Sequence, residues 1–375
     1  MLSFLRRIDW ISVVIIIALT VFGFFFIYSA GYRNADQAVS GMVSRQMIWA
    51  ITGFAVYIAA AAFDYRYLAR VQWWIYGAAI ILLVLVLFIG TSVYGAHRWF
   101  SIGGIMVQPS EIGKLALIFT LAGLLSSPAL ELNSRKIFMF SFLIAGVPFL
   151  LIVAEPDLGT AIVLIPVTIA MLFCAGCPLK PLLILIGLGL LGLLMMALWL
   201  KYFPETCPFL ADYQKNRILV FLNVNEDPLG AGWNKLQSQI AIGSGGLFGK
   251  GYLKGTQNIL GFLPRTVAPT DFIFSVVAEE TGFAGGVVLL TLYAVLIVRA
   301  VFTAVFARDR FGRLLAAGIG TLIFAHVFVN IAMTVGLMPI TGLPLPLMSY
   351  GGSFMVSIMA ALGLVQSVCL RRRRI

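Results

Sequence analysis

Apolar runs long enough to cross a lipid bilayer recur along this chain, and they limit what it can fold into. Of its 375 residues, 61% are hydrophobic and only 11% are charged. A soluble domain cannot hide that much apolar surface, because its area-to-volume ratio forces polar residues outward. A helix needs roughly 20 apolar residues to cross the hydrocarbon core. The pattern therefore predicts an all-α polytopic membrane protein with about ten transmembrane helices.

The candidate spans leave one long non-spanning stretch, residues 201–271, between the seventh and eighth helices. This stretch is rich in glycine, tryptophan and apolar residues, which disordered segments avoid. We expect short interfacial helices and tight glycine turns there. The whole chain, 1–375, is predicted to form a single integral membrane domain. The candidate spans are approximately 10–29, 47–63, 73–89, 111–127, 138–154, 160–176, 182–200, 272–298, 315–336 and 351–370.

The basic residues of the short connections gather on one side, which the positive-inside rule assigns to the cytoplasm. An even number of spans puts both termini on that side, so the long loop is expected to be extracytoplasmic. The net charge of +11 is spread over short loops and an arginine tail. Such a distribution suits anionic lipid headgroups better than nucleic acid, so we expect no nucleic-acid partner.

Residues 95–114, GAHRWFSIGGIMVQPSEIGK, form the first cluster of polar residues near the membrane. Gln108 precedes a helix start, and Glu111 falls in the first turn, where the helix dipole favours an anion. Glu111 and Lys114 are spaced to pair on one helix face. Arg98 is a strong donor to anionic oxygens. The alternative is a capped helix with a purely structural ion pair.

Two further clusters lie at span ends. EPDLGTA, residues 155–161, joins two spans and offers Glu155 and Asp157, either as functional carboxylates or as simple turn chemistry. Residues 330–353 contain three prolines and a Gly-Gly pair, and include Ser349. Irregular backbone at this depth is tolerated only where it is buried in protein or lines a cavity. His326 and Asn330 share a helix face near this stretch, and interhelical hydrogen bonds would explain them equally well.

The fourth cluster, residues 261–282, contains Thr270 and Asp271 where the loop re-enters the membrane. A carboxylate at such a boundary is partly desolvated, which raises its pKa toward that of a useful base. On a straight helix, Glu279 and Glu280 would lie roughly 12 Å deeper than Asp271. The alternative is that Asp271 only caps the helix start.

These clusters, in the order in which they follow one another along the chain, resemble the shape, elongation, division and sporulation (SEDS) family of bacterial cell-wall polymerases. The resemblance covers nearly the whole chain and is closer to the elongation branch than to the division branch. It is carried by HRWF with QPSE and Lys114, by PDLGTA, by QSQIAIGSGG at 237–246, by TDFIF with AEE, and by GLPLPLMSYGGS.

The resemblance implies a peptidoglycan glycosyltransferase of the bacterial plasma (inner) membrane, acting on lipid II during cell-wall elongation and cell-shape maintenance. The aspartate of the family's TDF motif is essential, and it corresponds to Asp271 here. A class B penicillin-binding protein is the implied protein partner. The chain departs from the family in reading FLPRTVAPTDF, with Arg265 at the usual glutamate and about two extra residues before Thr270.

The expected chemistry uses Asp271 as general base for the 4-hydroxyl of an acceptor sugar, with inversion at the donor's anomeric carbon. Cations must hold the departing diphosphate, and Arg98 and Lys114 are the first candidates, followed by Arg217, Lys250 and Lys254. A divalent cation, Mg²⁺ or Mn²⁺, bound by Glu111 or Asp157, could share that task. The remaining substrate-binding candidates are Gln108, Glu111, Asp157, Thr270 and Ser349.

Two other functions fit parts of the pattern. A lipid-precursor flippase or transporter would also use broken helices and intramembrane charges. The polar clusters, however, gather at one interface rather than at the midplane, and the halves show no inverted repeat. A non-catalytic scaffold would leave Asp271 and Arg98 without a task.

Overall fold

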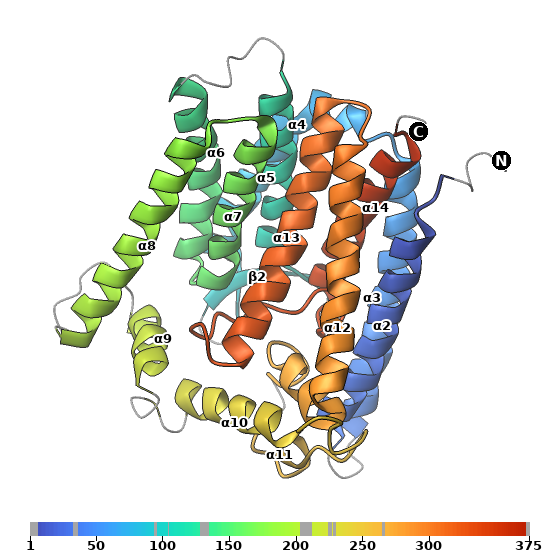
Figure 1. The fold of residues 1–375 in the computed structure, drawn as a ribbon, viewed down its shortest axis with the longest axis vertical. Coiled ribbons are helices and arrows are strands. Elements are labelled where there is room, and N and C mark those ends of the chain that lie inside the picture. Colours follow the sequence, from blue (N-terminus) through green and yellow to red (C-terminus); the bar gives the residue numbers. More distant parts are fainter. Residues whose placement is uncertain are drawn as a thin grey trace.

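The computed structural model describes residues 7–32, 37–93, 96–103, 105–127, 135–202, 212–223, 227, 230–264 and 267–372. Ten helices in this part of the chain are long and apolar enough to cross a membrane, which confirms the predicted number and order. They stand side by side as a bundle (Figure 1). These helices are α2 (Trp10–Gly31), α3 (Gln37–Ala62), α4 (Arg66–Ile89), α5 (Pro109–Ser126), α6 (Arg135–Ala154), α7 (Leu158–Ala175), α8 (Leu179–Tyr202), α12 (Ile273–Val305), α13 (Arg310–Thr334) and α14 (Gly352–Leu370).

Between the seventh and eighth spans the described part of the chain forms three short helices at one end of the bundle (Figure 1). They are α9 (Asp212–Leu222), α10 (Ala231–Ser244) and α11 (Thr256–Ile259), as expected for the 201–271 stretch. The connection from α4 to α5 contains a three-stranded antiparallel sheet of β1 (Thr91–Val93), β2 (Ala96–Ile102) and β3 (Ile105–Val107). These strands were not expected from the sequence, because two of them are only three residues long.

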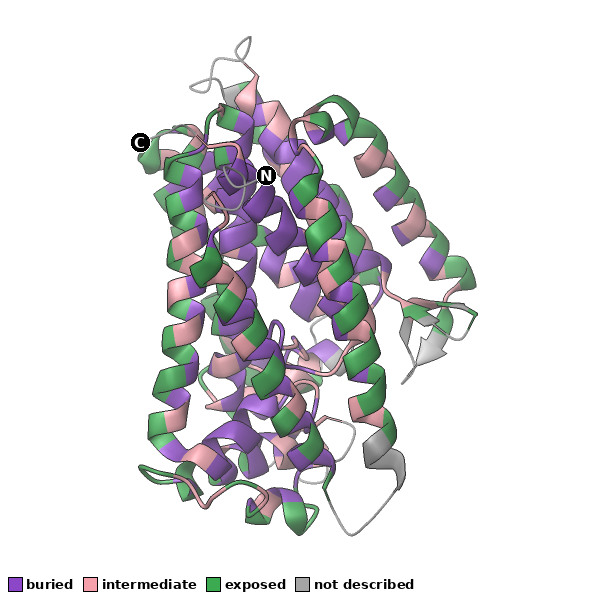
Figure 2. Cartoon of the chain, turned by 90° about the vertical axis from the view of Figure 1, so that its right-hand side faces the viewer, coloured by how far each residue is buried: buried purple, intermediate pink, exposed green. Residues whose placement is uncertain are grey.

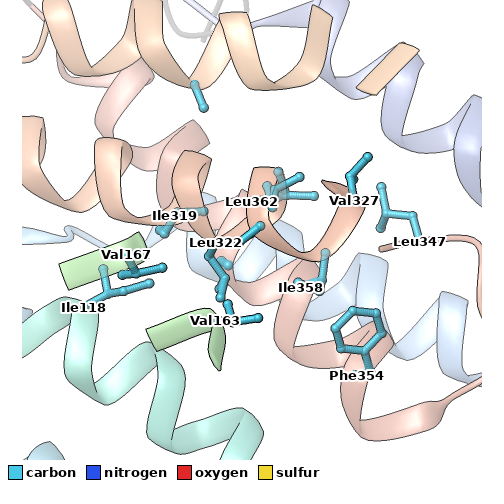
Figure 3. Close-up of a cluster of buried hydrophobic side chains, with 14 of the residues drawn as sticks. Ile118, Val163, Val167, Ile319, Leu322, Val327, Leu347, Phe354, Ile358 and Leu362 are labelled. Atoms are coloured by element: carbon cyan, nitrogen blue, oxygen red, sulfur yellow. The ribbon is translucent and has the colours of Figure 1, made fainter. Parts of the chain in front are cut away.

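The core of the bundle is formed by α5, α13 and α14. In α13 and in α14, 78% of the residues in the most apolar stretch are buried within the protein, whereas in α8 only 6% are. α8 therefore stands at the edge with most of its surface uncovered (Figure 1), and exposed residues also run along other outer helices (Figure 2). Figure 3 shows aliphatic side chains of α5, α7, α13 and α14 interdigitating, with Ile118, Val163, Ile319 and Ile358 among them.

α12 is interrupted at Gly282, whose φ of 67° and ψ of −163° are not helical. A side chain on Gly286 would begin only 3.8 Å from the ring of Phe274. In a straight helix these two residues would lie several turns apart. The chain therefore bends sharply at Gly282. The expectation that Glu279 and Glu280 lie deeper than Asp271 along one straight helix is wrong for this reason.

Candidate active site

Asp271 lies directly before α12, and its backbone is fixed by the proline-rich segment 338–351. Three consecutive carbonyls, those of Pro269, Thr270 and Asp271, each accept a hydrogen bond from that segment or from α13. The donors are the Tyr350 amide at 2.9 Å, the Ser349 hydroxyl, and the Asn330 side-chain amide at 2.8 Å. The Asp271 main chain therefore cannot shift without breaking contacts to two other parts of the bundle.

The Asp271 carboxyl group lies close to Gly342. A side chain on Gly342 would begin 3.3 Å from Oδ2 of Asp271, and the φ of Gly342 is +77°. Glycine meets both requirements, since it adopts positive φ freely and leaves room beside the carboxylate.

The surroundings of Asp271 suit a general base. Part of the residue is accessible, yet enough protein surrounds the carboxyl that burial, the largest cause, raises its pKa to about 6. Arg217 and Arg98 act in the opposite direction, and Asp157 adds to the rise. A carboxylate with this pKa is ionised at neutral pH and more basic than an exposed aspartate.

Arg217 reaches this site from α9, although the sequence pattern placed it only among the secondary cation candidates. One of its guanidinium nitrogens donates to the Thr341 carbonyl at 3.0 Å, next to Gly342. Among charged neighbours it is the strongest influence on Asp271. The sequence could not show that Arg217 lies near Asp271, because α9 and Asp271 are about 50 residues apart along the chain.

Arg98 and Asp157 organise the neighbouring part of the site. Nε of Arg98 donates to the Glu155 carbonyl at 2.9 Å, and the guanidinium also contacts the Pro156 carbonyl. Asp157 caps α7 by accepting from the Thr160 amide at 3.2 Å, and its Oδ2 accepts from Gln108 Nε2 at 2.9 Å. The strand carrying Arg98 and the start of α5 are thus tied to the α6–α7 turn.

Glu155 is a buried acid that the sequence pattern offered either as a functional carboxylate or as part of a turn. Its exposed fraction is 0%, and neither carboxyl oxygen has a hydrogen-bond partner among the described residues. Burial, followed by the charge of Asp157, raises its pKa to about 8, while Arg98 opposes the rise. Glu155 is therefore protonated at neutral pH, and Arg98 keeps its positive charge uncompensated by this neighbour.

The Lys114 ammonium is engaged by two other protein groups inside the bundle. Its side chain is 1% exposed, and Nζ lies 2.7 Å from Oε1 of Glu111 and 2.9 Å from Nε2 of His326. The other Glu111 oxygen accepts from the Ser357 hydroxyl at 2.7 Å. The predicted Glu111–Lys114 pair is present, but it joins α5, α13 and α14 inside the bundle. The geometry matches the structural alternative raised for this pair.

Three other candidates also have contacts within the protein. Lys250 Nζ lies 2.7 Å from Oε1 of Glu279, in the segment bonded to the α12 break. The Thr270 hydroxyl donates to the Val267 carbonyl at 3.2 Å. The buried Ser349 hydroxyl supports the backbone of Thr270 and accepts from the Leu345 amide. Arg265 and Thr266, within the altered loop sequence, lie outside the described residues.

The acids predicted as metal ligands are engaged elsewhere. Both oxygens of Glu111 and both of Asp157 accept hydrogen bonds from protein groups. Within the described residues, no group of three or more His, Cys, Asp or Glu side chains is arranged to hold a metal ion. Glu111 and Asp157 thus do not fit a shared divalent-cation site.

The fold and the site define a multi-pass membrane protein with a desolvated carboxylate, under the influence of two arginines, at one end of its bundle. A family model described as "Cell cycle protein", covering FtsW, RodA and SpoVE, matches residues 9–374. The chain belongs to this family.

Known relatives agree over nearly the full length. The peptidoglycan glycosyltransferase MrdB of Escherichia coli K12 is 38% identical, with 98% of this chain and 95% of that protein aligned. The peptidoglycan glycosyltransferase RodA of Treponema pallidum is 34% identical, covering 97% of this chain and 98% of that one.

Two solved structures share the fold. A chain from a peptidoglycan synthase complex that coordinates polymerization and crosslinking is 32% identical, with a TM-score of 0.79, covering 96% of this chain and 97% of that one. The rod shape determining protein RodA of Thermus thermophilus is 29% identical, with a TM-score of 0.70 and 98% of each chain covered.

Proposed function

We propose that this chain is a peptidoglycan glycosyltransferase that polymerises lipid II into glycan strands for cell-wall elongation. The observation that carries the proposal is Asp271, a partly accessible residue whose carboxyl pKa is raised to about 6 by burial and lowered by two arginines. A base and a cationic environment side by side are what transfer from a lipid diphosphate donor requires.

In the proposed reaction, an oxygen of Asp271 accepts the proton of the acceptor sugar's 4-hydroxyl. That hydroxyl oxygen forms the new bond to the donor's anomeric carbon as the bond to the lipid diphosphate breaks. The electron pair of the broken bond leaves with the diphosphate. Direct displacement by one hydroxyl inverts the configuration, because the reaction has no covalent enzyme intermediate.

Arg98 and Arg217 are the cations we assign to the developing negative charge on the diphosphate. Both influence Asp271 electrostatically, and each uses part of its guanidinium to contact backbone carbonyls. Those contacts hold the cations before substrate arrives, which is favourable for stabilising charge in the transition state. We do not assign the Lys114 ammonium to this role, because it is buried against Glu111 and His326.

The remaining assignments follow from the basic-residue asymmetry and the relatives. Both termini are assigned to the cytoplasm and the Asp271 end to the outside of the plasma membrane. A class B penicillin-binding protein is the proposed partner, in keeping with the synthase complex that contains a similar chain. The whole chain is assigned to one integral membrane domain.

The test is polymerisation of labelled lipid II by the purified protein in liposomes, alone and with a class B penicillin-binding protein. Wild type should form glycan polymer, and Asp271→Ala should lose on the order of 10²–10⁴-fold in rate. Asp64→Asn, a half-buried aspartate at the opposite end of the bundle, serves as matched control and should retain activity. Equal polymer from Asp271→Ala would remove Asp271 as base. Lipid movement between leaflets without polymer would favour a flippase.

A further inference from the structure

The turn formed by residues 246–251 carries two large apolar side chains that the fold leaves uncovered. Leu247 is 68% exposed and Phe248 is 83% exposed. Phe283, the first residue after the α12 break, is also largely exposed beside them. A group of exposed apolar side chains at one point usually marks contact with another surface.

The turn is rigidly fastened to α12. The amides of Phe283 and Ala284, which the break leaves without helical partners, donate to the Gly246 and Leu247 carbonyls at 2.9 and 3.0 Å. In the other direction, the Lys250 amide donates to the Glu279 carbonyl at 3.0 Å. The turn therefore satisfies the hydrogen bonds of a broken membrane helix, and Leu247 and Phe248 cannot move away from it.

Only glycines allow this close approach. A side chain on Gly249 would begin 2.1 Å from the Glu280 carbonyl oxygen, and one on Gly282 would begin 2.3 Å from the Gly249 nitrogen. Both glycines have positive φ, at 77° and 67°. These two glycines thus fix the position along α12 at which the turn contacts that helix.

The position of the turn along α12 corresponds to a membrane boundary. The helical stretch 283–305 rises roughly 34 Å at 1.5 Å per residue, which matches the hydrocarbon thickness with some tilt. Its exposed side chains, including Phe283, Val287 and Val288, form an apolar strip along the outside of the bundle. Leu247 is bonded to Ala284, which is itself exposed on that strip.

A second span borders the same turn. The Tyr252 hydroxyl donates to the Phe25 carbonyl of α2 at 3.0 Å, and its ring packs edge-on against Phe25 at 5.9 Å. Phe25 is exposed on the outside of the bundle. Tyrosine is enriched where protein crosses from hydrocarbon to headgroups, and the exposed Lys254 nearby suits lipid phosphates.

We propose that Leu247 and Phe248 insert into the lipid leaflet on the Asp271 side of the membrane and anchor the α12 break there. Lipid is the occupant because the turn continues the exposed apolar strips of α2 and α12. The anchor fixes the outer end of the helical stretch 273–281, whose other end carries Asp271.

The test uses wild-type protein in liposomes that contain a phospholipid with a photoreactive acyl chain, followed by mass spectrometry of the adducts. Phe248 should be labelled to a similar extent as Val287, and about tenfold more than Lys254 in the same loop, because burying a phenyl ring in lipid is strongly favourable. Adducts at Val287 with none at Leu247 or Phe248 would overturn the proposal.

A pair of variants provides a second readout. Phe248→Asp should reduce adducts at Leu247 and on peptide 247–252, whereas Lys254→Asp should leave them unchanged. Adducts on Val287 and Val288 report folding, since they depend on α12 rather than on the turn. Undiminished labelling of the turn in Phe248→Asp, with normal labelling of α12, would contradict insertion.

Discussion

The side-chain amide of Asn330 donates a hydrogen bond of 2.8 Å to the backbone carbonyl of Asp271. The same Nδ2 donates to the Leu343 carbonyl at 2.7 Å. One buried amide thus holds the segment bearing the proposed base against the proline-rich segment that contributes Gly342. The relative position of these two segments depends on Asn330, although its side chain does not touch the carboxylate of Asp271.

Replacing Asn330 with Ala should therefore lower the rate of polymerisation more than it lowers lipid II affinity. We expect a loss on the order of 10- to 10²-fold, since small misplacements of a catalytic group are costly. Rates at saturating lipid II measure the effect. Gln239→Ala is the matched control, because that amide donates to the nearby Val335 carbonyl at 3.2 Å rather than to Asp271. Equal losses in both variants would argue against a specific positioning role.

Gly342→Ala tests the space beside the base. Its new methyl group would begin 3.3 Å from Oδ2 of Asp271, on a backbone with φ of +77°. Gly103 has a φ of +58°, and a methyl group added there would have no neighbouring atom within 4 Å, so Gly103→Ala introduces similar strain without crowding. We expect Gly342→Ala to lose activity well beyond Gly103→Ala at comparable thermal stability. Matching activities would show that Gly342 serves only the backbone conformation.

Glu155→Gln should stabilise the protein in a pH-dependent way. The folded-state pKa of Glu155 is raised to about 8 by burial, so the folded state binds a proton that the unfolded state releases near its ordinary value of 4.5. As pH rises between these values, wild type should lose about 1.4 kcal/mol of stability per pH unit from this group, and the amide should not. The measurement is the difference in unfolding temperature from about pH 5 to pH 8. A difference that stays constant over this range would mean that Glu155 is ionised in the folded protein.

Lys114→Met should act on stability rather than on substrate binding. Removing one member of a buried ion pair leaves the other unpaired, and the typical cost is about 3–5 kcal/mol. The double variant Glu111→Gln, Lys114→Met should recover a large part of that loss. Thermal unfolding and the KM for lipid II separate the two roles. A raised KM at unchanged stability would show that Lys114 contacts the diphosphate after all.

The bilayer-spanning helices could be predicted from sequence because their signal is local. Each apolar run is bounded by polar or breaker residues, so the predicted 160–176 and the observed Leu158–Ala175 differ only at their ends. The same holds for Asp271, which falls at the boundary between an amphipathic loop and an apolar run. Local desolvation was enough to anticipate the direction of its pKa.

The contacts inside the site could not be predicted because they are long-range. Lys114 looked available from sequence, yet His326 meets it across 212 positions of chain. The bend at Gly282 was also missed, since the residues around it read as one continuous helix. Its cause lies in segment 246–251, which supplies the hydrogen bonds that the helix gives up.

The pH dependence of the polymerisation rate at saturating lipid II tests the role of Asp271 most directly. Asp271 must be ionised to act as base and its pKa is about 6, so the rate should be level above about pH 7 and fall about tenfold per unit below pH 6. The fall in rate at low pH should be reversible and independent of unfolding. A rate that stays constant between about pH 5 and pH 7, or rises as pH falls, would contradict Asp271 as the general base.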